Sequence, residues 1–196
     1  MKISTVFQRI EDAILKAGGK VVDPFPYFRS TPTIDAFEDA VDRYLEDSGV
    51  RHFTARELLR PTHPSVAERL GHEKGYLWPP MHQFPFAVLL LLWGDRARDI
   101  SGKPATCRNW YRPMHYQSQP DPTNPSKPIA KSKIHSDHPH ACGMDFDFRG
   151  DNLDAVRDYW LRVYEDNAEL LNTSLGDYGG GTFHIGVMSP RGHRSW

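Results

Sequence analysis

Apolar positions in the first part of the chain recur every three or four residues, which is the period of an amphipathic helix. The stretch 3–17 has this pattern up to Gly18, and the stretch 34–45 repeats it before Ser48 and the glycine that follows. Residues 1–50 are therefore expected to form two helices. These helices either make an accessory hairpin or pack on the main core.

Two further helices are predicted between residues 54 and 98. Thr54 and Glu57 have the spacing of a capping box, in which each side chain bonds to the backbone amide of the other residue. The longest apolar run, 86–93, predicts a buried helix that extends to Arg98. A membrane span needs about 20 apolar residues, so this run is too short to be one.

In the second half the pattern changes to alternation of apolar and polar residues, which is the period of a half-buried strand. Strands are predicted over 105–111, 143–149 and 182–188, with a helix that begins at Asn152 between the last two. The stretch 117–132 is rich in proline, lysine and serine without an apolar period, so we expect a surface loop and a candidate lid. This order of elements indicates an α+β domain, with a small antiparallel sheet packed against helices.

Alternation also predicts which side chains share a face of the sheet. In the strand 143–149, Asp145 and Asp147 lie on the face opposite the aromatic residues. In the strand 182–188, His184 likewise lies opposite the apolar positions. The residues expected to face the core are Met144, Phe146, Phe148, Phe183, Ile185 and Val187.

Two histidines before the first of these strands complete a candidate metal centre. His138 and His140 stand two apart in a proline-interrupted stretch that is expected to be extended, so both can point into one cleft with His184. Two imidazoles and one carboxylate are a three-ligand set used by catalytic zinc, whose fourth position stays open for water. Zn²⁺ is favoured over Mg²⁺ or Ca²⁺, because those ions prefer oxygen ligands. Either Asp145 or Asp147 could supply the carboxylate.

Composition argues against several other classes of protein. The chain has 196 residues and a net charge of -1, with no basic stripe of the kind that binds nucleic acid. Charged residues interrupt the start of the chain, so we expect no secretion signal and a protein that is cytoplasmic as synthesised. Cys107 and Cys142 are too few for a disulfide framework and are expected to be buried free thiols.

The run around the histidines resembles the signature of a known enzyme family. Residues 136–146 read Ser-Asp-His-Pro-His-Ala-Cys-Gly-Met-Asp-Phe, which is similar to the Ser-x-His-x-x-Gly-x-Ala-x-Asp motif of the D-Ala-D-Ala zinc peptidases. Ala141 stands in place of the motif's glycine, and Gly143 in place of its alanine. The segments 183–185 and 194–196 resemble the family's closing metal-ligand strand and its Arg-x-Trp ending.

The resemblance covers residues 53–196 and implies a hedgehog/DD-peptidase-like fold. It implies a zinc peptidase domain at 51–196. Residues 1–50 have no counterpart in the family and are expected to be a helical extension through which the chain could form homo-oligomers or assemble into a virion. The expected enzyme binds Zn²⁺ and cleaves peptidoglycan stem or cross-link peptides, as cell-wall carboxypeptidases and phage endolysins do. A phage-encoded protein that acts at the cell wall or in the virion would fit this expectation.

The resemblance also implies roles for individual residues. The zinc ligands that it implies are His138, Asp145 and His184. Arg112, in a segment similar to the family's Gly-Tyr-Arg, would orient the substrate or stabilise its oxyanion. In a second register, His140 and Asp147 keep the same histidine-to-aspartate spacing and restore the motif's glycine.

The general base that is usual in the family is missing from this sequence. Many relatives carry a carboxylate three residues before the last ligand or two residues after it, where this chain has Gly181 and Gly186. Asp147, Asp177 or His140 could act instead, within hydrogen-bond reach of the attacking water. An alternative is a catalytically weak or inactive protein with a structural or binding role, for example in a phage particle. An intracellular amidase or dipeptidase is a third hypothesis.

Overall fold

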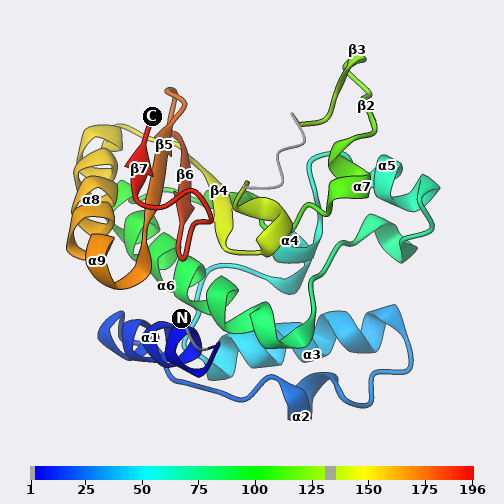
Figure 1. Ribbon diagram of the computed structural model, residues 1–196, viewed down its shortest axis with the longest axis horizontal. Helices are drawn as coiled ribbons and strands as arrows, with labels where there is room; N and C mark the ends of the chain where they lie inside the picture. Colours follow the sequence, from blue (N-terminus) through cyan, green and yellow to red (C-terminus); the bar gives the residue numbers. More distant parts are fainter. Residues whose placement is uncertain (1–2, 131–135) are drawn as a thin grey trace.

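Helix α6 (Phe84–Ser101) lies between the N-terminal helices and a small sheet (Figure 1). The computed structural model describes residues 3–130 and 136–196. The predicted α+β class is confirmed, because helices pack against a mainly antiparallel sheet. The other helices and turns of the described chain are α1 (Ile3–Lys16), α2 (Phe25–Phe28), α3 (Ile34–Asp47), α4 (Ala55–Leu59), α5 (Pro64–Arg69), α7 (Met114–Gln117), α8 (Leu153–Asp166), α9 (Ala168–Leu171) and the 3₁₀ turns η1 (Glu73–Gly75), η2 (Met81–Gln83) and η3 (His138–His140).

Most of α6 is buried, as its continuous apolar run predicts. Asp95 in this helix is 2% exposed, and its carboxylate accepts hydrogen bonds from the backbone amides of Arg51 (2.7 Å) and His52 (3.1 Å). Gly94 lies against the ring of Phe146 in the sheet, where an added Cβ would come within 2.6 Å of a ring carbon. Within the part of the chain that the structure describes, no helix, α6 included, is long and apolar enough to cross a membrane.

Helices α1 and α3 are the two amphipathic helices expected among the first fifty residues. Phe7 of α1 meets Phe86 of α6 edge-on, with 6.0 Å between ring centroids. Tyr44 of α3 lies 6.1 Å from the ring of Phe84, also edge-on. Buried residues of both helices belong to the same core cluster as the sheet, so they pack on the main core rather than apart from it. The domain boundary at residue 50 stays a prediction.

The predicted capping box opens helix α4. Thr54 Oγ1 accepts a hydrogen bond from the Glu57 amide (3.3 Å), and Glu57 Oε2 accepts one from the Thr54 amide (3.2 Å). These bonds satisfy amide groups that have no partner inside the helix. The helix then directs Leu58 and Leu59 into the core.

The strands of the main sheet have the order β1-β4-β6-β5-β7, and each neighbouring pair is antiparallel except β5 with β7. Their bounds are β1 (Ala105–Asn109), β4 (Gly143–Phe148), β5 (Ser174–Asp177), β6 (Thr182–Gly186) and β7 (Arg194–Ser195). The three predicted strands are therefore present as β1, β4 and β6, and each ends earlier than expected. Both cysteines, Cys107 in β1 and Cys142 just before β4, are buried free thiols, as predicted.

The stretch 117–132 contains structure that the sequence did not predict. It begins at the last residue of α7 and includes a small hairpin of β2 (Pro120–Asp121) and β3 (Asn124–Pro128). The expected exposure is confirmed for β3, every residue of which is exposed, whereas Gln117 at the start of the stretch is buried. The pattern missed the hairpin because these strands have no apolar face to bury. Residues 131 and 132 lie outside the described chain, and a lid stays a prediction.

Candidate metal centre

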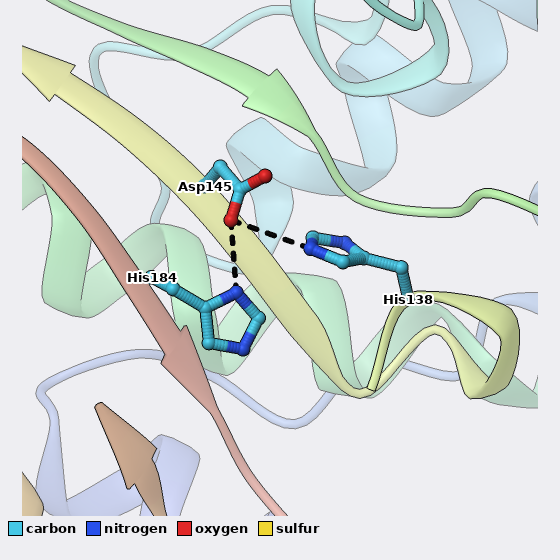
Figure 2. A group of neighbouring side chains, drawn as sticks. All are labelled: His138, Asp145 and His184. Atoms are coloured by element: carbon cyan, nitrogen blue, oxygen red, sulfur yellow. Dashed lines mark hydrogen bonds and ion pairs between the residues drawn. The ribbon is translucent and has the colours of Figure 1, made fainter. Parts of the chain in front are cut away.

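Three side chains from separate segments meet at one point beside the sheet. Figure 2 shows His138 from the turn η3, Asp145 from β4 and His184 from β6, with both imidazoles directed at the same carboxylate oxygen. Asp145 Oδ1 lies 2.8 Å from His184 Nδ1 and 3.3 Å from His138 Nε2. One ligand atom from each residue lies within 4.8 Å of the other two, and all three residues are buried. This group can hold a metal ion.

The pairing of β4 with β6 places two of these residues side by side. Asp145 is the direct antiparallel partner of His184, and both lie on the face opposite the core, as alternation predicted. The core face of the same strands and of the residue after β6 is filled by aromatic and aliphatic residues that are at most 1% exposed: Met144, Phe146, Phe148, Phe183, Ile185 and Val187. Asp145 is itself buried, because the turn η3 and the end of β1 cover it.

The expectation of an extended segment at the two upstream histidines was wrong. Residues 138–140 form a 3₁₀ turn, with Pro139 in its first positions, and Ala141 ends the turn in the left-handed conformation with φ of 53°. The turn directs His138 inward, where it is 3% exposed, and leaves His140 on the surface. The two imidazoles therefore do not share a cleft.

The second nitrogen of each imidazole bonds to a fixed acceptor. His138 Nδ1 lies 3.0 Å from the carbonyl oxygen of Trp110, and His184 Nε2 lies 3.0 Å from Asp137 Oδ2. A carbonyl and an ionised carboxylate only accept hydrogen bonds, so each of these ring nitrogens donates. The opposite nitrogens, Nε2 of His138 and Nδ1 of His184, face Asp145. They are the sides of the rings that can bind a cation, either a proton or a metal ion.

Burial and neighbouring charges shift the pKa of each residue in this group. Burial would raise the pKa of Asp145, but the charges and hydrogen bonds of His138 and His184 lower it well below its usual value. Burial, assisted by Arg112, lowers the pKa of His138. Burial also acts to lower the pKa of His184, but its hydrogen bonds with Asp137 and Asp145 outweigh burial and raise it. The centre thus combines ionised carboxylates with imidazoles that can bind a cation.

The second oxygen of Asp145 lies beside the polar side chains of Asn109 and Arg112. Asn109 Nδ2 donates to Asp145 Oδ2 over 3.2 Å, while Asn109 Oδ1 accepts from the hydroxyl of Thr62 over 2.9 Å. The sequence reasoning missed Asn109, since one amide at the end of a strand carries no distinctive signal. Arg112 Nη2 lies 3.7 Å from Asp145 Oδ2, and Arg112 Nε is buried and has no hydrogen-bond partner among the described residues. Arg112 therefore adjoins the centre and retains an unused donor.

The other predicted site residues lie outside the group of three. Asp147 pairs with Arg108 (2.8 Å) and accepts a hydrogen bond from the hydroxyl of Thr182 (2.7 Å). Asp177 pairs with Arg157 at 2.7 Å. His140 and Asp147, the ligand pair of the second register, are not part of the described group that can hold a metal ion. The geometry thus favours the first register.

Arg194 and Trp196 lie beside the metal centre. The rings of Trp196 and His184 lie 5.4 Å apart, and the Arg194 guanidinium lies 4.4 Å from the Trp196 ring. Arg194 Nη2 lies 3.7 Å from Asp137 Oδ2. The Arg-x-Trp ending singled out in the sequence therefore lies beside the last histidine of the group.

Comparisons with known proteins give no family assignment: no family model, curated protein or solved structure matches this chain.

Proposed function

We propose that this protein is a zinc-dependent peptidase that cleaves peptidoglycan stem or cross-link peptides. The single observation that carries the proposal is the convergence of His138 Nε2, Asp145 Oδ1 and His184 Nδ1 on one point. These are the atoms of the residues that the peptidase-like motifs single out. Two imidazoles and one carboxylate favour zinc over the harder cations.

The donor set fits a catalytic zinc ion. Ligand atoms around one zinc ion stand about 3 to 4 Å apart, which is close to the separations of 2.8 Å and 3.3 Å at Asp145 Oδ1. When bound, zinc polarises the scissile carbonyl and lowers the pKa of a coordinated water to about 7. The protein's own groups then orient the peptide and move the proton.

Arg112 is the residue that we assign to the substrate. Its guanidinium adjoins Asp145 and its side chain is 16% exposed, so a terminal N–H of the guanidinium can donate to a carbonyl or carboxylate oxygen of a peptide. The same donor would stabilise negative charge that develops on the scissile carbonyl oxygen. Arg112 therefore orients the peptide and stabilises its oxyanion.

Asp147 and His140 are our candidates for the group that accepts the water proton. Asp147 shares the site face of β4 with Asp145, about 7 Å further along the strand. Its ion pair with Arg108 would have to loosen before it could accept a proton. His140 follows the inward-facing His138 in the same turn and is exposed, so its side chain would have to turn toward the centre to accept the proton.

A structural or binding role is the second candidate function. The observation that favours it is the presence of Gly181 and Gly186 where many relatives carry the general base. Losing such a group costs about 100- to 10,000-fold in rate, so the centre would bind a metal and peptides with little turnover. In that case we propose that the protein serves in assembly, for example in a phage particle, through the helices of residues 1–50.

The first experiment measures zinc and cleavage in the same preparations. Purified protein is expected to bind one zinc ion and to release muropeptide fragments from purified peptidoglycan. A chelator should abolish release, and added zinc should restore it. Zinc binding without hydrolysis of any muropeptide would favour the binding role, while cleavage that survives the chelator would contradict zinc hydrolysis.

A matched pair of variants on one strand tests the ligand register. Asp145→Asn should weaken zinc binding by more than about 100-fold, because changes in groups behind the ligands alone cost 10- to 100-fold. Asp147→Asn should leave zinc affinity within about twofold of the wild-type value, since Asp147 bonds to Arg108 and Thr182 instead. The reverse pattern would assign the metal to the second register.

A further inference from the structure

Asp137, which the sequence reasoning missed, is a buried carboxylate directly behind His184. Its side chain is fully buried, and its Oδ2 lies 3.0 Å from His184 Nε2. The hydroxyls of Ser174 (2.5 Å, to Oδ2) and Ser189 (2.7 Å, to Oδ1) donate to it as well. A buried carboxylate is costly unless hydrogen bonds compensate it, and here both oxygens are satisfied.

Because of these contacts, Asp137 can only accept a hydrogen bond from the imidazole of His184. Both serine hydroxyls donate to the carboxylate, and the Arg194 guanidinium adds positive charge 3.7 Å away. With two hydroxyl donors and a guanidinium directed at it, the carboxylate of Asp137 accepts a hydrogen bond from His184, so the hydrogen lies on Nε2.

Two glycines provide the room that Asp137 occupies. A Cβ added at Gly143 would lie 2.6 Å from Asp137 Cβ and 2.7 Å from His184 Cε1. A Cβ added at Gly186 would lie 2.4 Å from Ser174 Oγ and 2.7 Å from Asp137 Oδ2. These glycines stand at two of the positions where the chain departs from the peptidase-like pattern. The departures therefore coincide with the space that the carboxylate needs.

We infer that Asp137 is a positioning residue that holds His184 as its Nε2–H tautomer, with Nδ1 turned toward Asp145 and His138 for metal binding. This inference rests on the proposed metal centre and adds the device that orients one of its ligands. Groups that accept the second N–H of a ligand histidine fix its orientation and raise its basicity, and their loss typically weakens metal binding 10- to 100-fold.

The test compares Asp137→Asn with a matched control in the full chain. Asp95→Asn removes another buried carboxylate, one that bonds to the backbone amides of Arg51 and His52 rather than to the metal group. Zinc affinity is measured by competition with a chromophoric chelator, and folding by circular dichroism and thermal melting. Asp137→Asn should bind zinc 10- to 100-fold more weakly, while Asp95→Asn should bind as the wild type does even if its melting temperature falls.

A wild-type measurement keeps the inference falsifiable if Asp137→Asn fails to fold. Long-range ¹H–¹⁵N spectra of zinc-loaded protein with ¹⁵N-labelled histidine should show His184 protonated at Nε2 and metal-bound at Nδ1. A merely structural Asp137 would not dictate that tautomer. The opposite tautomer, or wild-type zinc affinity in Asp137→Asn, overturns the inference and leaves the metal centre standing. Absence of zinc binding by the wild type overturns both the inference and the metal centre. Weaker zinc binding by Asp137→Asn, together with no peptide cleavage by the wild type, rejects only the proposed peptidase activity.

Discussion

The substitution Gly143→Ala tests the packing behind the metal centre with a single methyl group. The new Cβ would lie 2.6 Å from Asp137 Cβ and 2.7 Å from His184 Cε1. Carbon atoms in contact stand about 3.5 to 4.0 Å apart, so these atoms must separate by about 1 Å. Neither neighbour can swing aside, because Asp137 Cβ is attached to the backbone and the His184 ring is buried beside Trp196.

The expected free-energy change has two opposing parts. Overpacking a buried site costs about 1 to 3 kcal/mol. Replacing a glycine within a strand by alanine returns about 0.5 to 1 kcal/mol of conformational entropy. The backbone conformation of Gly143 is not left-handed, so no strain is added there. Gly143→Ala should therefore destabilise the protein by up to about 2.5 kcal/mol.

Denaturant unfolding and zinc competition together provide the assay. Gly143→Ala should shift the unfolding midpoint downward with an unchanged slope, and it should weaken zinc binding about 10-fold or more because His184 is displaced. Thr106→Ala, at an exposed position of the neighbouring β1, serves as the control and should not change zinc affinity. A Gly143→Ala protein as stable as the wild type, with the same zinc affinity, would refute the close approach of Asp137 and His184 to this glycine.

Three further predictions concern other parts of the chain. Arg112→Lys should lower kcat/KM for peptide cleavage about 10- to 100-fold, because lysine loses the planar pair of donors, while zinc affinity in the same competition assay stays unchanged. Thr54→Ala should cost about 1 kcal/mol in urea unfolding, whereas Thr54→Ser should restore most of it; equal stability of both variants would exclude a working capping box. Burial raises the pKa of both Cys107 and Cys142 well above the usual value, so a thiol reagent should label them only on unfolding, and rapid labelling of the folded protein would contradict their placement.

The parts of the centre that lie on regular strands could be predicted from the sequence. The two-residue period of β4 and β6 determines which side chains leave the core, and it correctly directed Asp145 and His184 to the same face. The turn at His138 could not be predicted in this way, because a proline-interrupted segment has no period. The hairpin β2–β3 was missed for the related reason that it buries no apolar face.

Asp137 and its partners show why the periodicity of a sequence does not predict hydrogen-bond networks between side chains. Its hydrogen-bond partners Ser174 and Ser189 are 37 and 52 residues away along the chain. A serine carries no positional signal of its own, and β5, which bears Ser174, has only four residues. The sequence signal for Asp137 was instead the two glycines, Gly143 and Gly186. The peptidase-like pattern has alanine at the first position and often a carboxylate at the second.

The placement of α6 has a consequence for how this chain can be shortened. Phe84 and Phe86 pack against aromatic rings contributed by α1, α2 and α3, and Leu92 lies against Gly19. A fragment that starts at residue 51 would therefore present these apolar side chains to water as one contiguous patch, which promotes aggregation. Expression trials that trim the amino terminus should thus recover insoluble material, although the trimmed segment supplies no residue to the metal-binding group.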